Sequence, residues 1–262
     1  MGLFKGEVFM FATLSSKSVK TLLLAGLSIG AIAVSSAKAE DGKFSDAQKQ
    51  EIQKIMKEYL MDNPEMITEA MNGLREKQER MAEEQAKDMI KKYEADFRSG
   101  KYPYAGNKDG DVVVVEFYDY NCGYCKKALP DVQALLKEDD NVMVVFMDMP
   151  ILGPTSLTAA KWAIAAQNQD KYFEYHTALM SYQGGKDEAT LERLAKDVGL
   201  DIEKMKADAE SKETQERINE SMNIAREIGV QGTPAFIVGD KFFRGYIGEE
   251  ALLATVKDQH KG

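Results

Sequence analysis

The 262-residue chain has little with which to cross-link a fold or hold a metal, since it contains only two cysteines and two histidines. A structural zinc site takes about four ligands, and His176 and His260 lie far from each other in the sequence. A disulfide between Cys122 and Cys125 would close too small a loop to stabilise so long a chain. A zinc site and a purely structural disulfide are therefore the weaker interpretations, and we predict no cofactor.

The chain also lacks an apolar run long enough to cross a bilayer, which takes roughly 20 residues. Its most apolar stretch, 21–34, has 14 residues and follows Lys17 and Lys20. Ala37-Lys38-Ala39 then supplies the small-x-small pattern of a signal-peptidase site. We predict that residues 1–39 are a cleaved secretory signal, with an uncleaved anchor as the alternative.

Basic residues are in short supply. Without residues 1–39, 30 basic and 42 acidic residues remain, a net charge of about −12, which argues against nucleic acid as a partner. The remaining 223 residues are enough for one domain of moderate size and an appendage. In an exported protein a lone cysteine pair favours a disulfide that takes part in chemistry.

Both cysteines lie in one stretch, DVVVVEFYDYNCGYC, over residues 111–125. Residues 112–115 are β-branched, which predicts a buried strand, and a helix is expected to open at Cys122 after a turn. The amino end of a helix stabilises a thiolate. Cys125, one turn further on, is spaced to close a disulfide with Cys122 and release a bound partner. Redox catalysis is the favoured interpretation, and copper(I) held by the two thiolates is an alternative.

The segment EFYDYNCGYCKKALP resembles the thioredoxin-fold thiol–disulfide oxidoreductases of the bacterial DsbA type. In that superfamily a buried acid lies six residues before the first cysteine and a proline eight after it, the places of Glu116 and Pro130. The resemblance implies that Glu116 accepts the proton of Cys125; a carboxylate that merely pairs in the core is the alternative. On an apolar strand, this carboxyl is expected to have a raised pKa.

A second motif, GVQGTPAF over residues 229–236, places a proline at the start of a predicted strand. Only about 5–6% of X–Pro bonds are cis, so the sequence by itself favours trans. The resemblance, however, implies a cis Pro234 facing the cysteines, with the Thr233 backbone free to pair with an extended client segment. Gly123 and Tyr124 complete the predicted substrate-contacting residues.

Residues 40–99 have a helical pattern, interrupted at Asp62-Asn63-Pro64. Spacings of four and three give the second helix a heptad-like seam, formed by Ile67, Met71, Leu74, Gln78 and Met81. Such a helix pair buries too little surface alone, so it must pack on the catalytic domain or on a copy of itself. We favour a homo-oligomer formed through residues 40–98. Packing, rather than copper binding, is the favoured use of the methionines.

The predicted fold is α/β: a thioredoxin-like domain over residues 100–262, with a helical insertion at about 155–230, preceded by the all-helical region 40–99. The segment SLTAAKWAIAAQNQDKYFEYHTALM looks like the insert of the DsbA family. Trp162 and His176 fall within it and are expected to pack in the core.

The direction of catalysis depends on how strongly the first thiolate is stabilised. Strongly oxidising DsbA proteins resemble a Cys-Pro-His-Cys pattern, and here Gly123 and Tyr124 stand between the cysteines without a histidine. Three features resemble disulfide isomerases of the DsbC type: the Cys-Gly-Tyr-Cys sequence, Thr233 before Pro234, and the helical arm predicted at residues 40–98. The N-terminal helical extension also resembles that of exported proteins of the suppressor-of-copper-sensitivity ScsC type. An isomerase or reductase is therefore favoured, a DsbA-like oxidase is the alternative, and a copper-binding or purely structural envelope protein is a further one.

The resemblance also implies partners and a compartment. Cysteine-containing exported proteins would be the clients, and a membrane thiol-redox protein would reset the cysteine pair. The predicted location is the periplasm; association with the outer membrane, the number of subunits and the identity of the clients stay open.

Overall fold

The computed structural model describes residues 44–260, so the predicted signal at 1–39 lies outside the described residues. The chain divides into two units, the second beginning at Asn63. In the first unit, helix α1 (Asp46–Asp62) begins after Ser45, whose Oγ accepts a hydrogen bond from the backbone N–H of Gln48 at 3.3 Å, as an N-cap does. Within 44–260, no helix is long and apolar enough to span a membrane.

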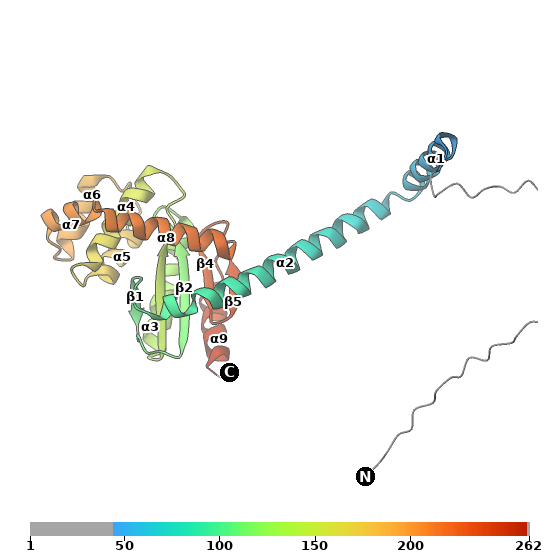
Figure 1. Ribbon diagram of the computed structural model, residues 1–262. Coiled ribbons are helices and arrows are strands. Elements are labelled where there is room, and N and C mark those ends of the chain that lie inside the picture. Colours follow the sequence, from blue (N-terminus) through green and yellow to red (C-terminus); the bar gives the residue numbers. More distant parts are fainter. Residues whose placement is uncertain (1–43, 261–262) are drawn as a thin grey trace, which may run out of the picture. The chain divides into compact units, whose positions relative to one another are not determined.

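A five-stranded mixed sheet forms the centre of the second unit (Figure 1). Its order is β1 (Tyr104–Gly106), β3 (Val142–Asp148), β2 (Val112–Tyr118), β4 (Ala235–Val238) and β5 (Lys241–Arg244). Strands β2 and β3 are parallel, and the other neighbours are antiparallel. Every residue of β2 and β3 is buried, as the apolar runs in the sequence predict.

Helices lie on both faces of this sheet. The helices of the second unit are α2 (Glu65–Arg98), α3 (Gly123–Glu138), α4 (Pro154–Gln167), α5 (Tyr172–Ser181), α6 (Glu188–Asp197), α7 (Ile202–Ala209), α8 (Lys212–Ile228) and α9 (Glu249–Gln259), of which α6 and α7 pack on other helices. Because strand side chains alternate between faces, Val112, Val114 and Tyr118 join a core with α3, α4, α5 and α9. Val113, Val115 and Phe117 join a second core with α2 and α8.

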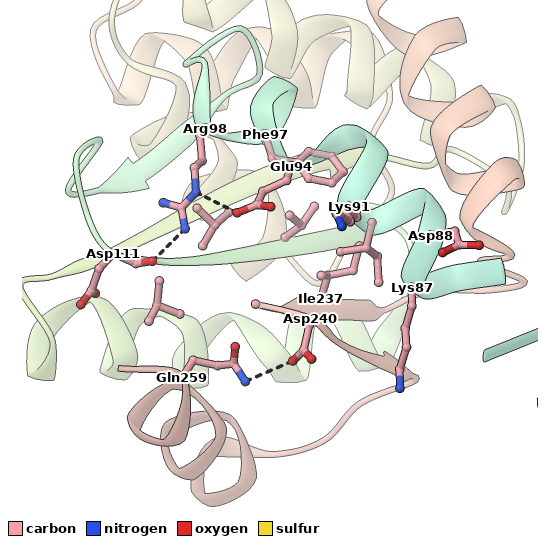
Figure 2. A pocket seen from close by; sticks show the side chains of 15 residues that line it. Lys87, Asp88, Lys91, Glu94, Phe97, Arg98, Asp111, Ile237, Asp240 and Gln259 are labelled. Atoms are coloured by element: carbon pink, nitrogen blue, oxygen red, sulfur yellow. Dashed lines mark hydrogen bonds and ion pairs between the residues drawn. The ribbon is translucent and has the colours of Figure 1, made fainter. Parts of the chain in front are cut away.

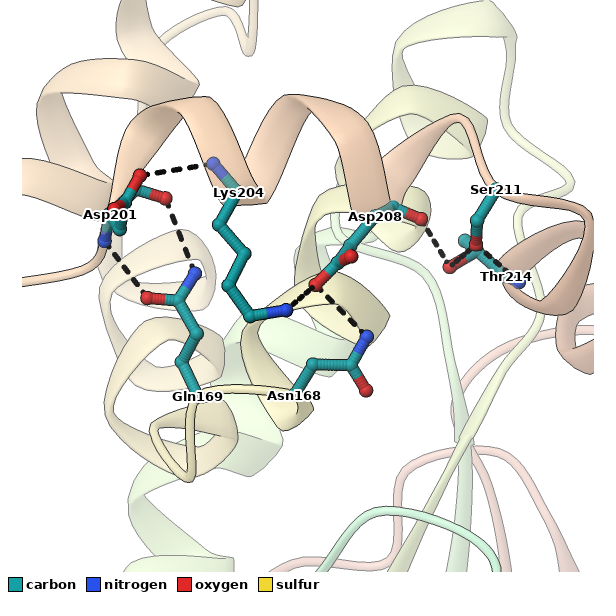
Figure 3. A network of polar contacts seen from close by, with 7 residues as sticks. All are labelled: Asn168, Gln169, Asp201, Lys204, Asp208, Ser211 and Thr214. Atoms are coloured by element: carbon teal, nitrogen blue, oxygen red, sulfur yellow. Dashed lines mark hydrogen bonds and ion pairs between the residues drawn. The ribbon is translucent and has the colours of Figure 1, made fainter.

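The helical insertion comprises α4 to α8 and lies between β3 and β4 in the chain. Figure 3 shows polar contacts that join the end of α4 to α7: Asn168 donates to Asp208 at 3.0 Å, and Gln169 exchanges hydrogen bonds with the backbone of Asp201. The Asp201 carboxylate caps α7 by accepting from the Lys204 N–H. Trp162 and His176 are buried in the insertion, as predicted.

Helix α2 contributes its C-terminal turns to the core of the second unit. Its last turns pack on the second face of the sheet, where Ala86, Ile90 and Phe97 are buried. Arg98 donates to the backbone oxygens of Gly110 and Asp111 at 2.9 and 2.8 Å. Residues 86–98 therefore pack as part of the second unit, because without them apolar side chains of β2 and β4 would lie open to water.

The earlier part of α2 carries an exposed apolar stripe. Its large apolar side chains with substantial exposure are Met66, Ile67, Met71, Leu74 and Met81. They include the four apolar positions of the predicted seam. Self-association of this helix stays a proposal.

Candidate active site

Cys122 is the N-cap residue of α3, with an extended backbone, and the helix begins at Gly123. Its N–H donates to the Asp119 carbonyl at 3.0 Å, while its own carbonyl accepts from Lys126 at 3.1 Å. The side chain of Cys122 is 8% exposed and that of Cys125 is 1% exposed, and both are free thiols. The pair thus consists of an outer and an inner sulfur.

The predicted motif at residues 229–236 lies beside the cysteine pair. The Thr233–Pro234 peptide bond is cis, as the resemblance implies. In its protonated form, the Cys122 thiol donates to the Thr233 carbonyl oxygen at 3.2 Å, across 111 positions of sequence. An extended polypeptide that paired with the Thr233 backbone would therefore run beside the outer sulfur.

The two sulfurs have opposite shifts in pKa. A hydrogen bond with Cys125 is the largest of the causes that lower the pKa of Cys122 to about 5; the Thr233 side chain and the N–H groups of Cys125 and Tyr124 add to it, while burial opposes it. Burial, the bond with Cys122 and the charge of Glu116 raise the pKa of Cys125. At neutral pH, Cys122 is a thiolate and Cys125 a thiol, so only the outer sulfur is ready to attack.

Glu116 is buried on β2, in register with Phe146 and Phe236. Burial raises the pKa of its carboxyl to about 8, with smaller contributions from Cys122 and Asp131. The charge of Glu116 in turn contributes to the raised pKa of Cys125. A carboxyl with this pKa can take up and release a proton near neutral pH.

The two residues between the cysteines lie at the surface. A side chain at Gly123 would meet nothing within 4 Å, so the packing of the chain itself does not demand glycine there. Tyr124 is 63% exposed, and its ring lies 6.2 Å from that of Tyr246. Lys127 stands 4.5 Å above the Tyr246 ring. Tyr246, which the sequence analysis missed, joins Tyr124 to form an aromatic surface near the pair.

Behind the turn that precedes Cys122 lies a buried polar cluster. The Tyr118 hydroxyl is 2.5 Å from that of Tyr172 and 3.2 Å from that of Tyr120, which contacts His176 Nδ1 at 3.1 Å. Burial lowers the pKa of His176 to about 3, so this imidazole is neutral. The cluster supports the turn from within the core.

A separate hollow of about 460 Å³ lies between α2 and the other face of the sheet. In Figure 2, Arg98 reaches the backbone of Asp111 at one side of it, and Gln259 donates to Asp240 at another. Neither cysteine lines this hollow. Over residues 44–260, no three histidine, cysteine, aspartate or glutamate side chains gather into a metal site.

Comparison with known proteins agrees with this geometry. The family model described as thioredoxin matches residues 98–258. The chain belongs to the thioredoxin family. A second model, the N-terminal domain of the copper resistance protein ScsC, matches residues 48–80, which span most of α1 and the exposed part of α2.

Solved structures identify the branch of the family. A thioredoxin-like oxidoreductase from Silicibacter pomeroyi is 40% identical with a TM-score of 0.62, covering 64% of this chain and 98% of its own. The thiol-disulfide exchange protein alpha-DsbA2 from Wolbachia pipientis is 32% identical with a TM-score of 0.63, covering 67% and 96%. Proteus mirabilis ScsC in a transitional conformation is 26% identical with a TM-score of 0.61, covering 84% and 98%. The thioredoxin domain is thus of the DsbA and ScsC type.

Curated relatives cover less of the chain. The antiporter NhaA 1 of Salinispora arenicola is 32% identical over 159 residues, which are 60% of this chain and 24% of that protein. The chain therefore spans about a quarter of the length of this antiporter. The probable disulfide bond formation protein D of Bacillus anthracis is 31% identical over 51% of this chain and 67% of its own length.

Proposed function

We propose that this protein exchanges disulfides in exported proteins, as an isomerase or reductase that works through Cys122 and Cys125. The observation that carries the proposal is the asymmetry of the pair: Cys122 has a lowered pKa and lies 3.2 Å from the Thr233 carbonyl, while the pKa of Cys125 is raised. An outer thiolate beside a backbone that can pair with a client is what attack on a protein disulfide requires.

In the first step, the Cys122 thiolate attacks one sulfur of a client disulfide. A mixed disulfide forms, and the other client sulfur leaves as a thiolate. During isomerisation, that thiolate attacks another disulfide of the client, and a later client thiolate attacks the mixed disulfide. Cys122 is then released as a thiolate, and the exchange has no net change in electrons.

Reduction follows a second branch. Glu116 takes the proton of Cys125, whose thiolate attacks the Cys122 sulfur of the mixed disulfide. The client leaves reduced, and the enzyme holds a Cys122–Cys125 disulfide. A membrane thiol-redox partner would have to supply two electrons and two protons to restore the dithiol.

An oxidase that runs this branch backwards is the second candidate, favoured by the pKa of about 5 at Cys122. A stabilised thiolate favours the reduced pair and makes its disulfide more oxidising, and this value lies between those of thioredoxin, about 7, and DsbA, about 3.5. Two features favour isomerisation over oxidation: no histidine lies between the cysteines, and the chain has an N-terminal helical arm.

Refolding of scrambled ribonuclease separates the two functions. The reduced enzyme should restore ribonuclease activity without added oxidant, and Cys122→Ser should not. Failure of the reduced enzyme, together with fast oxidation of a reduced dithiol peptide by the oxidised enzyme, would identify an oxidase.

We also propose that the arm forms a homo-oligomer and that the protein works in the periplasm after removal of residues 1–39. The exposed stripe of α2 and the match to the ScsC N-terminal domain support the first proposal; the sequence of the first 39 residues supports the second. A copper-binding envelope protein remains the alternative of another class. Copper(I) affinity that survives Cys122→Ser would require methionine ligands and would favour this alternative.

A further inference from the structure

Asp119, three residues before Cys122, has the most hydrogen-bonded carboxylate near the site. Its side chain is buried, with 1% exposure. The carboxylate accepts four hydrogen bonds, from Asn121 N (2.7 Å), Ser156 Oγ (2.8 Å), Ile151 N (2.8 Å) and Leu152 N (3.0 Å). Four donors fill the acceptor sites of an ionised carboxylate, so this side chain joins the turn before α3 to the loop and helix that follow β3.

The backbone of the same residue contacts both cysteines. Its carbonyl accepts from the Cys122 N–H at 3.0 Å. A backbone hydrogen bond from Asp119 also lowers the pKa of Cys125, against the larger effects that raise it. A movement of Asp119 would therefore displace the outer sulfur and the inner sulfur together.

The turn is tied to the same loop by further bonds. Asn121 donates from its side chain to Thr155 Oγ1 and Ser156 Oγ, both at 2.9 Å. The Met149 N–H donates to the Tyr118 carbonyl at 2.8 Å. These bonds converge on the segment after β3 and the first turn of α4, which the Asp119 carboxylate also contacts.

A buried cation lies within electrostatic reach of this carboxylate. Lys186 is 1% exposed, and its Nζ has no hydrogen-bond partner among residues 44–260. Burial and Lys126 lower the pKa of Lys186 to about 8, and Asp119 opposes that shift. Lys126 donates instead to the Tyr182 carbonyl at 3.0 Å. Asp119 thus has a buried lysine within electrostatic reach.

We propose that Asp119 is a positioning residue for disulfide exchange: its carboxylate fixes the turn that presents Cys122 to Thr233 and to the donors of the helix terminus. The inference rests on the proposed function. Stabilisation of the thiolate depends on donor geometry, because hydrogen bonds weaken steeply when they are misaligned. The four hydrogen bonds accepted by the Asp119 carboxylate fix the turn, and so keep the donors aligned with the Cys122 sulfur.

Asp119→Asn tests this role because a positioning role and simple electrostatics predict opposite shifts in the ionisation midpoint of Cys122. Removal of a nearby negative charge alone would make Cys122 easier to ionise. An amide nitrogen, however, cannot accept the bonds of two of the four donors, so the turn should loosen and the thiolate should lose aligned donors. We expect the ionisation midpoint of Cys122, measured from thiolate ultraviolet absorbance, to rise by about one unit, which leaves about fivefold less thiolate at a pH near the wild-type midpoint.

Two further variants keep the result interpretable. Ser156→Ala removes one of the four donors and keeps the charge, and should raise the midpoint by a smaller amount; it carries the test if Asp119→Asn does not fold. Asp201→Asn makes the same chemical change at the cap of α7 and should leave the midpoint unchanged. A midpoint that falls or stays constant in Asp119→Asn, or stays constant in Ser156→Ala when that variant alone folds, overturns the positioning role. The proposed function fails separately, if the wild-type enzyme does not exchange disulfides with glutathione.

Discussion

The thiol of Cys122 lies 3.2 Å from the carbonyl oxygen of Thr233, although 111 positions separate the two residues. The Thr233 side chain also forms a hydrogen bond that lowers the pKa of the same sulfur. One residue therefore offers a backbone for client pairing and a hydroxyl for the thiolate. These two contributions can be separated by substitution.

Thr233→Val removes the hydroxyl and keeps the backbone and the shape of the side chain. A hydrogen bond to a charged group contributes about 1.5–3 kcal/mol when intact, less where solvent competes, so the pKa of Cys122 should rise by about half a unit to one unit. Titration of the thiolate absorbance measures this shift. The matched control is Thr255→Val, which removes a hydroxyl that donates to the Ala251 carbonyl in α9. It should leave the pKa of Cys122 unchanged.

Glu116→Gln should slow the second chemical step and spare the first. The attack of Cys122 does not need the acid, whereas Cys125 must lose a proton whose pKa burial has raised. Loss of a general base costs about 10²-fold or more, so the mixed disulfide with a client should accumulate. Acid quenching followed by mass spectrometry measures that species. Equal slowing of both steps would argue against Glu116 as the proton acceptor.

The same substitution should change how stability depends on pH. Burial raises the pKa of Glu116 from 4.5 to about 8 in the folded protein. A group with a raised pKa contributes full stability below its unfolded pKa, and this contribution falls as pH rises through the folded value. The free energy of unfolding of the reduced protein should therefore decline between pH 4.5 and 8, and the decline should be smaller in Glu116→Gln. Chemical denaturation at several pH values measures both curves.

His260 gives a second pH-dependent contribution at a different place. Its Nδ1 is 2.6 Å from Asp111 and its Nε2 is 2.7 Å from Asp139, and hydrogen bonding with Asp139, followed by the charges, raises its pKa above 6.5. The stabilisation is complete below pH 6.5 and is lost as pH rises through the folded pKa. His260→Gln should remove this loss and leave disulfide exchange unchanged. If the stability of His260→Gln depends on pH as that of the wild type does, His260 does not stabilise the fold through its contacts with Asp111 and Asp139.

Truncation of the arm should have different results at two boundaries. Removal of the chain up to residue 80 takes away the exposed stripe apart from Met81, and should give a monomer that keeps thiol oxidation and loses isomerisation. Removal up to residue 98 also strips Ala86, Ile90 and Phe97 from the core and should unfold the domain, since Phe97→Ala alone is expected to cost about 3–5 kcal/mol. Light scattering and thermal unfolding measure these results. A monomeric full-length protein would contradict the role of the arm.

Much of the fold and the site could be predicted where the signal is local. The β-branched run before Cys122 predicts β2, and the residues that follow Cys122 predict the start of α3. The spacing of Glu116 and Pro130 relative to Cys122 indicates the family. The position of Thr233 beside the sulfur was implied by the resemblance and is a contact of the structure.

Other features depend on partners distant in the chain, and their residues carry no local sign of them. Ala86, Ile90 and Phe97 lie among charged residues, so the end of α2 has the pattern of a solvated helix until the sheet is placed beneath it. Asp119 has the appearance of an ordinary turn residue, because three of its four donors come from residues more than 30 positions later. His260 meets Asp139 across 121 positions.

Titration of Cys122 in the reduced wild-type protein tests the central claim most directly. Thiolate absorbance followed against pH, with Cys122→Ser as the blank, should show one ionisation with a midpoint of about 5, while Cys125 stays protonated through neutral pH. A midpoint near 9, the value of an unperturbed thiol, would show that Cys125, Thr233 and the helix terminus do not stabilise a thiolate, and would contradict the account.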